Sequence, residues 1–392
     1  MSSFASRLLI PALCALWAAG CTRQVRPTEP STPRLTPEEA TALVPESVPD
    51  REGWALDTLN ALDRNHLPAD LPSVCAVFAV VEQESNYHAN PVVPDLARIV
   101  RRRLESYAEK LGPLGATALE QLLQARARGS KATFGERLRQ VRTERDLDLV
   151  FRDLIRYSKE EHPILFGAAD LASELTGRGS LSQLNPITTA GSMQVSVRFS
   201  VEYAARQSGD GEADEWVVRD RLYTRAGGLY LGSARLLGYD AGYDAPVYRF
   251  ADYNAGFYAS RNAAVQDALS QLTGRPLVPD GDLLAYDEDG DARDEPSNTE
   301  KALRLFTARY ATWISDGHLR ADLLQEKSHG FEETDTYRAL AATWLKKTGR
   351  PLPYARLPEV AIVSPKMKSK RTTKWFAQSV LRRYEACLRR AR

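Results

Sequence analysis

Apolar residues recur at intervals of three and four positions through almost the whole chain after residue 36, and this period constrains the fold most. An amphipathic α-helix needs this spacing to bury one face. Strand patterns are scarce, and residues 360–363 are the best, weak candidate. The sequence therefore predicts a mainly α protein. The helical stretches are 51–66, 95–112, 115–128, 144–161, 213–239, 254–273, 300–314 and 331–348.

The composition excludes several classes of protein. Lys and Arg number 52 against 51 Asp and Glu, so the chain lacks the excess positive charge of a nucleic-acid binder. Apolar residues make up 43% of 392 residues, which is enough for a packed core and excludes global disorder. The five histidines and four cysteines show no metal-ligand spacing, and no phosphate-binding loop is present. We therefore expect no metal, no other cofactor and no nucleic-acid partner.

The N-terminus predicts export and a membrane anchor. A basic start is followed by an apolar run over residues 8–20, which has the length of a secretory signal and is too short to span a bilayer. Ala19-Gly20-Cys21 resembles the cleavage box of bacterial lipoproteins, which implies that residues 1–20 are removed and that Cys21 is lipidated. The alternative is plain secretion with a free Cys21.

The residues after this box suggest a location. Thr22 follows the cysteine where inner-membrane lipoproteins carry Asp, so the resemblance implies the periplasmic face of the outer membrane. Residues 21–36 contain three prolines and few large apolar side chains, and we expect them to form a tether. Cys75 and Cys387 would then remain in an oxidising compartment, where a disulfide can form. The sequence leaves open whether they pair or stay as separate buried thiols.

Two charge blocks lie near the C-terminus. Residues 280–300 carry nine acids, and the alternation of Asp287, Asp289 and Asp291 is similar to the start of an EF-hand loop. The required glycine and bidentate glutamate are missing, so we favour a solvated acidic loop over a metal site. Residues 366–392 carry ten bases against one acid and have helical spacing. This pattern predicts a docked terminal helix with a basic outer face.

One segment is apolar on every side and then abruptly polar. Residues 74–81 predict a buried central helix, and Glu82 and Glu84 follow at its C-terminal end. There the helix dipole and the apolar surroundings disfavour an ionised carboxylate, so a glutamate can keep its proton near neutral pH, as a glycosidic acid must. Residues two apart project about 200° from each other on a helix. Only one of the two can face a given cleft, and position alone does not decide which.

Four short motifs follow one another along the chain: Glu84-Ser85, Gly191-Ser192-Met193-Gln194, Gly228-Leu229-Tyr230-Leu231 and Tyr253-Asn254-Ala255-Gly256. In this order they resemble the motifs of the lysozyme-like lytic transglycosylases. The resemblance covers roughly residues 70–94 and 180–270, about a third of the chain. It implies peptidoglycan glycan strands as the substrate, cleavage of the MurNAc-GlcNAc β-1,4 bond and a 1,6-anhydromuramyl product.

The resemblance also implies a role for each residue that matches a motif. Glu84 would be the sole catalytic acid and base: it protonates the leaving oxygen and then takes the proton of the muramyl 6-hydroxyl, while the 2-acetamido group of the substrate stabilises the positive centre. Most glycosidases need two carboxylates instead. Glu82 is expected to make a salt bridge and is the reserve candidate. The residues implied to shape the substrate site are Ser85, Met193, Gln194, Tyr230, Tyr253 and Asn254.

The chain departs from that family in three places. Glu84 and Gly191 are 107 residues apart where the family has a short connection, and residues 95–176 are expected to form a helical insertion. Asp252 stands where the family usually has Ala, and it could raise the pKa of Glu84 or act as a base for hydrolysis. Residues 279–392 match no part of the family. We therefore expect a lysozyme-like domain over 37–278 and an additional C-terminal helical region after an acidic loop.

Three functions follow from these observations. The first is a membrane-anchored murein lytic transglycosylase. The second is a muramidase-type hydrolase of the same bond, in which Asp252 would be the discriminating residue. The third is a non-catalytic lipoprotein that binds peptidoglycan or serves as a scaffold for other enzymes.

Overall fold

The structure is a computed structural model that describes residues 33–392 apart from 111–112, 162–184, 186, 210, 288–289 and 363–370. The predicted signal peptide, the lipidation site at Cys21 and most of the tether lie outside the described residues. No helix within the described ranges is both long and apolar enough to cross a bilayer.

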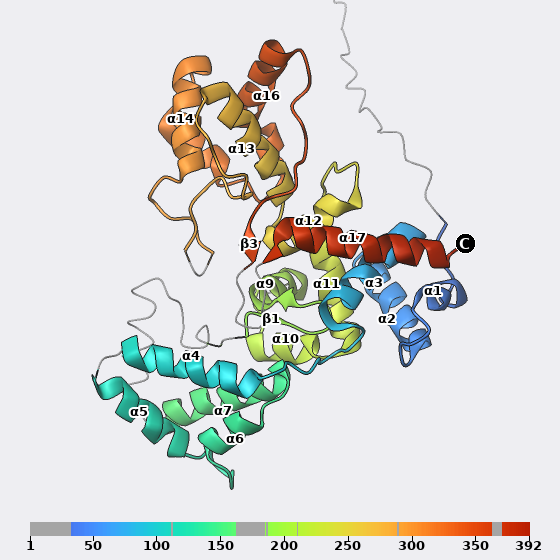
Figure 1. Cartoon of the computed structure of the whole chain (residues 1–392), viewed down its shortest axis with the longest axis vertical. Helices are drawn as coiled ribbons and strands as arrows, with labels where there is room; N and C mark the ends of the chain where they lie inside the picture. The colour runs from blue at the N-terminus through green and yellow to red at the C-terminus, as the bar shows by residue number, and fades with distance from the viewer. Residues whose placement is uncertain are drawn as a thin grey trace, which may run out of the picture. The chain divides into compact units, whose positions relative to one another are not determined.

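The prediction of a mainly α protein is confirmed, since helices form nearly all of the regular structure that is described (Figure 1). Two short antiparallel hairpins complete it, one joining β1 (Thr189–Ala190) to β2 (Val195–Ser196) and the other joining β3 (Ala361–Ile362) to β4 (Arg371–Thr372). A 3-10 helix, η2, covers His329–Glu333. The helices are α1 (Pro37–Leu43), α2 (Arg51–Arg64), α3 (Leu71–Ser85), α4 (Leu96–Lys110), α5 (Pro113–Gln124), α6 (Phe134–Gln140), α7 (Glu144–Glu161), α9 (Val197–Ser208), α10 (Glu215–Leu222), α11 (Arg225–Leu237), α12 (Pro246–Ala255), α13 (Ala259–Thr273), α14 (Asn298–Tyr310), α15 (Asp316–Leu323), α16 (Asp335–Thr348) and α17 (Thr373–Arg390).

Local capping explains where two predicted helices differ from the observed ones. The stretch 213–239 is two helices rather than one, because the Thr224 hydroxyl accepts a hydrogen bond from the Gly227 amide at 3.0 Å and starts α11. The stretch 254–273 begins later than predicted, because α12 runs to Ala255 and Gly256, at φ 123°, ends it. Such a backbone angle is open to glycine and breaks the helical path.

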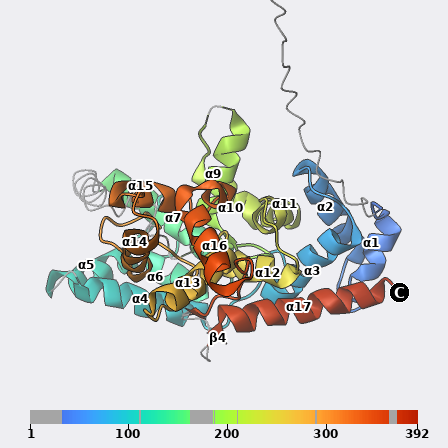
Figure 2. The ribbon, with the colours of Figure 1, turned by 90° about the horizontal axis from the view of Figure 1, so that it is seen from above.

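A first hydrophobic cluster surrounds α3. Every residue from Val74 to Val81 is at most 4% exposed, as the all-apolar pattern predicts. The terminal helix α17 lies along α3 and α12, so the last residues of the chain return to the first cluster (Figures 1 and 2). Cys75 on α3 and Cys387 on α17 form a disulfide, which settles the alternative that the sequence left open. The predicted docking of the terminal helix is thus confirmed.

A second hydrophobic cluster is built by α13, α14, α15 and α16. Its fully buried side chains include Leu269, Phe306 and Leu323. This cluster includes α13, which precedes the predicted domain boundary at residue 278, whereas α17, which follows the boundary, packs in the first cluster. The boundary at residue 278 stays a prediction. The packing places α13 with the helices α14 to α16, and α17 with the helices of the first cluster.

Glu326 is a carboxylate enclosed in the second cluster. It has no exposed surface and accepts hydrogen bonds from the backbone amides of Leu283 and Leu284, the Tyr286 hydroxyl and the Asn262 side-chain amide. Removal from water outweighs these donors and raises the pKa of Glu326 from 4.5 to about 7. The group therefore binds a proton in the folded protein at pH values where it would be ionised in the unfolded chain.

This shift predicts a pH-dependent stability. Because the folded-state pKa lies above the unfolded one, the free energy of unfolding should fall by about 3 kcal/mol as the pH rises from about 4.5 to about 7. Glu326→Gln carries no titrating group, so its stability relative to the wild type should rise by about 2.5 kcal/mol between pH 5 and pH 8. Urea unfolding of both proteins at the two pH values measures this difference. An equal pH response of the two proteins would contradict the raised pKa.

Candidate functional site

Three of the four motif segments meet at the hairpin β1–β2. The Tyr253 hydroxyl, near the end of α12, donates a hydrogen bond of 2.8 Å to the backbone carbonyl of Met193 in the hairpin turn. Burial and then the nearby negative charge of Glu84 raise the pKa of Tyr253 above its ordinary value of 10. The end of α3, the hairpin and α12 therefore bring Glu84, Met193 and Tyr253 into one group.

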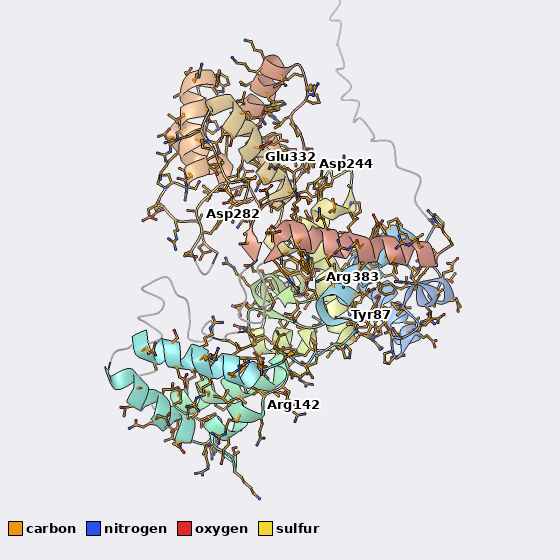
Figure 3. The ribbon with its side chains drawn as sticks, viewed as in Figure 1. Tyr87, Arg142, Asp244, Asp282, Glu332 and Arg383 are labelled. Carbon is orange, nitrogen blue, oxygen red and sulfur yellow. A yellow bond between two sulfur atoms is a disulfide. The ribbon has the colours of Figure 1, made fainter. Side chains whose placement is uncertain are left out.

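The structure separates the two glutamates at the end of α3. Glu82 faces α17, where its Oε1 lies 3.6 Å from the Nε of Arg383, so the expected salt bridge is present. Arg383 is labelled on α17 in Figure 3. Glu84 is partly buried, and its negative charge helps to raise the pKa of Tyr253. Residues two apart on a helix project in nearly opposite directions. The carboxylate of Glu82 therefore lies against α17, and the carboxylate of Glu84 lies on the side of the hairpin.

Local hydrogen bonds fix the end of α3. The buried Ser85 hydroxyl donates to the Val81 carbonyl at 3.0 Å and accepts from the His88 amide at 3.3 Å. Asn86 follows in the left-handed region at φ 48° and ends the helix. Ser85 thus holds the backbone beside Glu84, and its predicted contact with substrate stays a prediction.

The hairpin turn needs glycine at one position. Gly191 has φ 80°, and a Cβ atom there would lie 2.2 Å from the backbone carbonyl oxygen of Leu222. Gln194, at φ 51°, closes the turn with an amide hydrogen bond of 3.1 Å to the Gly191 carbonyl. The first residue of the Gly-x-Met-Gln motif is therefore set by close backbone packing against the end of α10.

Substituting this glycine should be far more harmful than substituting one with the same backbone angle in open space. Gly209 also has φ 80°, but nothing lies within 4 Å of the position of its Cβ. We expect Gly209→Ala to cost about 1 kcal/mol, which is the cost of a left-handed alanine. Gly191→Ala should cost about 3 kcal/mol or more, because a backbone carbonyl cannot move aside. Urea unfolding measures both, and equal costs would contradict the close packing.

The remaining motif, Gly228-Leu229-Tyr230-Leu231, lies on α11, and this helix packs against the hairpin β1–β2. A Cβ atom on Gly232 would lie 2.2 Å from the Sδ atom of Met193, and one on Gly228 would lie 3.0 Å from the Ser192 hydroxyl. Met193 has no exposed surface. Its side chain therefore packs the hairpin onto α11, and its backbone carbonyl is the part that contacts Tyr253.

Tyr230 and Asn254 are the other two predicted site residues, and they lie in two different environments. Tyr230 is 8% exposed, and its ring contacts the guanidinium groups of Arg64 at 4.5 Å and Arg221 at 5.4 Å and the edge of the Tyr203 ring at 5.9 Å. These contacts place Tyr230, on α11, against side chains of α2, α9 and α10. Asn254 is exposed near the C-terminal end of α12.

Asp252 is a structural residue. It has no exposed surface; its Oδ2 accepts hydrogen bonds from the hydroxyls of Tyr239 at 3.0 Å and Tyr243 at 2.6 Å, and its Oδ1 accepts one from the Ser260 amide at 2.7 Å. Burial raises the pKa of Asp252 despite these donors. A carboxylate with no contact with solvent cannot activate a water molecule in this conformation. Its hydrogen bonds instead fix α12 against the start of α13.

The sequence analysis missed one buried residue of the site, Glu144. This residue opens α7, within the predicted insertion, and is 2% exposed. One of its carboxylate oxygens accepts a hydrogen bond of 2.9 Å from the Nε2 of Gln194. No motif surrounds Glu144, and its partner is 50 residues away, so the sequence carries no signal for the contact.

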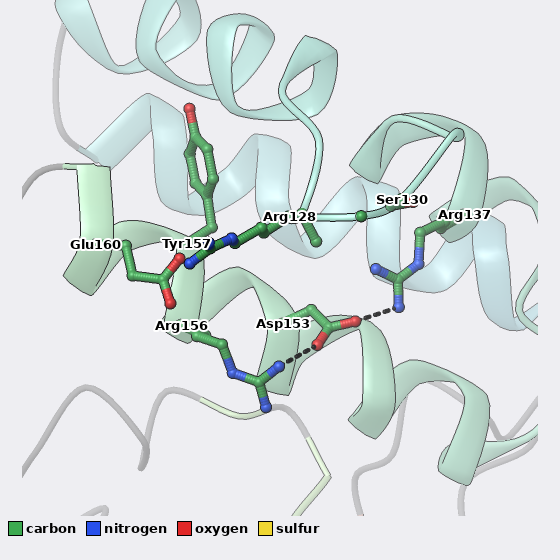
Figure 4. A pocket seen from close by; sticks show the side chains of 9 residues that line it. Arg128, Ser130, Arg137, Asp153, Arg156, Tyr157 and Glu160 are labelled. Carbon is green, nitrogen blue, oxygen red and sulfur yellow. Dashed lines mark hydrogen bonds and ion pairs between the residues drawn. The ribbon is translucent and has the colours of Figure 1, made fainter.

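Two hollows lie away from this group of residues. One, of about 300 Å³, lies in the predicted insertion between the start of α6 and α7, where Asp153 bonds Arg137 at 2.7 Å and Arg156 at 3.5 Å (Figure 4). The other, of about 250 Å³, lies between α3 and α12 and is lined by Tyr243 and Tyr384 among others. Neither contains a predicted site residue, so the candidate site rests on the meeting of the motifs.

The acidic block holds no metal-binding group within the described residues. No cluster of three or more His, Cys, Asp or Glu side chains suited to a metal ion occurs there or elsewhere among them. Asp291 forms an ion pair of 2.9 Å with Arg198, and Asp289 lies outside the described residues.

Comparisons with known proteins place the chain in a family. Residues 47–390 match the family described as Protein of unknown function (DUF1615). Over 346 residues the chain is 38% identical to Uncharacterized protein YaiW of Escherichia coli (strain K12), an alignment that covers 88% of this chain and 87% of that protein. No solved structure matches. Since both matches extend over most of the chain, it belongs to the DUF1615 family.

Proposed function

We propose that this protein is a peptidoglycan lytic transglycosylase with Glu84 as its catalytic acid and base. One observation carries the proposal: the Tyr253 hydroxyl bonds the Met193 carbonyl at 2.8 Å while the charge of Glu84 acts on the same tyrosine. Motifs that are 107 and 60 residues apart in the sequence therefore meet around one carboxylate. A chance resemblance would not require them to meet.

The surroundings suit a single carboxylate that transfers a proton twice. Glu84 lies at the C-terminal end of α3, where the helix dipole favours the protonated acid that must donate to the leaving oxygen. The raised pKa of Tyr253 keeps its hydroxyl protonated, so it remains a hydrogen-bond donor throughout the working pH range. The enclosure of Asp252 removes the candidate base for water, which favours attack by the muramyl 6-hydroxyl over hydrolysis.

In the proposed architecture, α3, the hairpin β1–β2, α11 and α12 form a lysozyme-like domain. The helices α4 to α7 belong to the insertion, and α17 closes the domain from the C-terminal region. We further propose that lipid on Cys21 anchors the protein to the periplasmic face of the outer membrane, with glycan strands of peptidoglycan as its partner. The Pro-containing tether would let the domain reach the wall from that surface.

The test is the chemical form of the products. The full chain, purified in detergent, is incubated with murein sacculi, and the soluble muropeptides are weighed by mass spectrometry. Products lighter than hydrated muropeptides by one water molecule are expected. Hydrated reducing ends would replace the proposal by a hydrolase, and sacculi that bind the protein without any release would replace it by a peptidoglycan-binding lipoprotein.

A further inference from the structure

We propose that Glu144 is a positioning residue that holds the side-chain amide of Gln194 in the orientation used by the site. The inference rests on the proposed function and adds a role for the predicted insertion. The helix α7, which the lytic transglycosylase motifs do not include, would then form part of the site wall.

The hydrogen bonds of Gln194 define a single orientation of its amide. Nε2 donates to the Glu144 carboxylate at 2.9 Å and to the Gly191 carbonyl at 3.3 Å, and Oε1 accepts from the Thr189 hydroxyl at 3.1 Å. A flipped amide would set its carbonyl oxygen against the carboxylate and the backbone carbonyl, neither of which offers a proton when the carboxylate is ionised. The bond to Glu144 is the shortest of the three and has a carboxylate as its acceptor, so it is the strongest.

Gln194 bonds this anchor and directly follows Met193, which contacts Tyr253. The carbonyl of its neighbour Met193 accepts the Tyr253 hydroxyl at 2.8 Å, and Tyr253 senses the charge of Glu84. Gln194 itself is partly exposed, so its amide can meet a ligand that Glu144 cannot reach. A shift of the amide would therefore change the surface offered to the substrate beside Glu84.

A second buried acid fixes α7 in place. Asp148, 1% exposed, accepts hydrogen bonds from the side-chain amide of Asn185 at 2.6 Å and from Arg219 at 3.1 Å. The same nitrogen of Arg219 donates to the carbonyl of Ile187, just before β1, at 2.9 Å. The helix that carries Glu144 is thus joined to α10 and to the chain entering the hairpin, so Glu144 keeps a fixed distance from Gln194.

A double-mutant cycle tests the proposal on the full chain. Glu144→Ala should lower kcat/KM for release of anhydromuramyl products about 30-fold, mostly through KM, because the charge-assisted bond is lost. Gln194→Ala should lower it by a similar factor. The double variant should be no worse than Gln194→Ala alone, because the proposed effect of Glu144 on the substrate runs through that amide. Glu144→Gln keeps an acceptor oxygen for the Gln194 amide and should stay within about threefold of the wild type.

Asp148→Asn is the matched control, because it weakens the attachment of α7 without removing the bond to Gln194. It should lower the thermal unfolding temperature while losing less kcat/KM than Glu144→Ala does, because the bond between Glu144 and Gln194 remains. Full activity of Glu144→Ala, additive losses in the cycle, or a loss of kcat/KM in Asp148→Asn as large as that in Glu144→Ala would each overturn the positioning role while leaving the proposed function intact.

The cycle can also be measured without catalysis. If the wild type binds GlcNAc-MurNAc oligosaccharides but releases no product, the dissociation constants of the four proteins replace kcat/KM, and the same non-additivity is expected. The proposed activity would then fail while the inference stands. A wild-type protein that neither cleaves nor binds the oligosaccharide would overturn both.

Discussion

Glu84→Gln should lower kcat/KM for release of anhydromuramyl products at least about a thousandfold, whereas Glu82→Gln should stay within about threefold of the wild type. The amide of Gln cannot protonate the leaving oxygen or accept the proton of the 6-hydroxyl. Asp252, which the sequence offers as an alternative base, has no exposed surface and is held by Tyr239, Tyr243 and Ser260.

Glu82 is a close control for this experiment. It has the same side chain, lies two residues away on the same helix and undergoes the same isosteric change. Its partner is Arg383 on α17, at 3.6 Å, and both side chains are partly exposed. Loss of such an ion pair costs about 1 kcal/mol or less, so Glu82→Gln should fold and act normally.

The assay is the mass-spectrometric one, run at equal protein concentrations and with thermal unfolding measured for each variant. Loss of product with both variants at normal stability would mean that the end of α3 matters as a surface rather than through one acid. Loss of product with Glu82→Gln but not with Glu84→Gln would make Glu82 the catalytic residue and would remove the proposed role of Tyr253.

Local patterns predicted the helices well and long-range contacts poorly. The capping box at Thr36 and Glu39 forms as the sequence indicates, because both of its hydrogen bonds join residues three apart. The all-apolar run of α3 is buried for a similarly local reason. The break before α11 was missed, because the capping bond of Thr224 competes with an unbroken helical pattern that continues on both sides of it.

In the candidate site, too, the residues within short motifs could be predicted from the sequence, whereas the long-range contacts could not. Glu84, Met193 and Tyr253 lie in short motifs, and the structure brings their segments together. Glu144 reaches the site from a helix whose sequence reads as an ordinary amphipathic segment, so only the fold reveals it. Asp252 stands beside the motif in the sequence, yet Tyr239 and Tyr243 before it and Ser260 after it enclose its carboxylate, and sequence spacing does not report burial.

Removing the disulfide should be the largest single loss of stability. The Cys75–Cys387 bond closes a loop of 312 residues, and a cross-link over so long a loop restricts the unfolded chain strongly. We expect Cys75→Ala/Cys387→Ala to lower the free energy of unfolding by about 4 kcal/mol. Urea unfolding of the oxidised wild type and of the variant measures this, and Cys387→Ala alone should lose as much, since one cysteine cannot form the bond.

The position of this bond relates stability to the proposed activity. It joins α17 to α3 at Cys75, nine residues before Glu84 on the same helix, and both cysteines are fully buried in the first cluster. The double variant should therefore keep its activity at low temperature, where the remaining contacts of α17 with α3 and α12 hold it in place. It should lose activity at a lower temperature than the wild type. A loss of less than about 1 kcal/mol would mean that packing alone fixes α17.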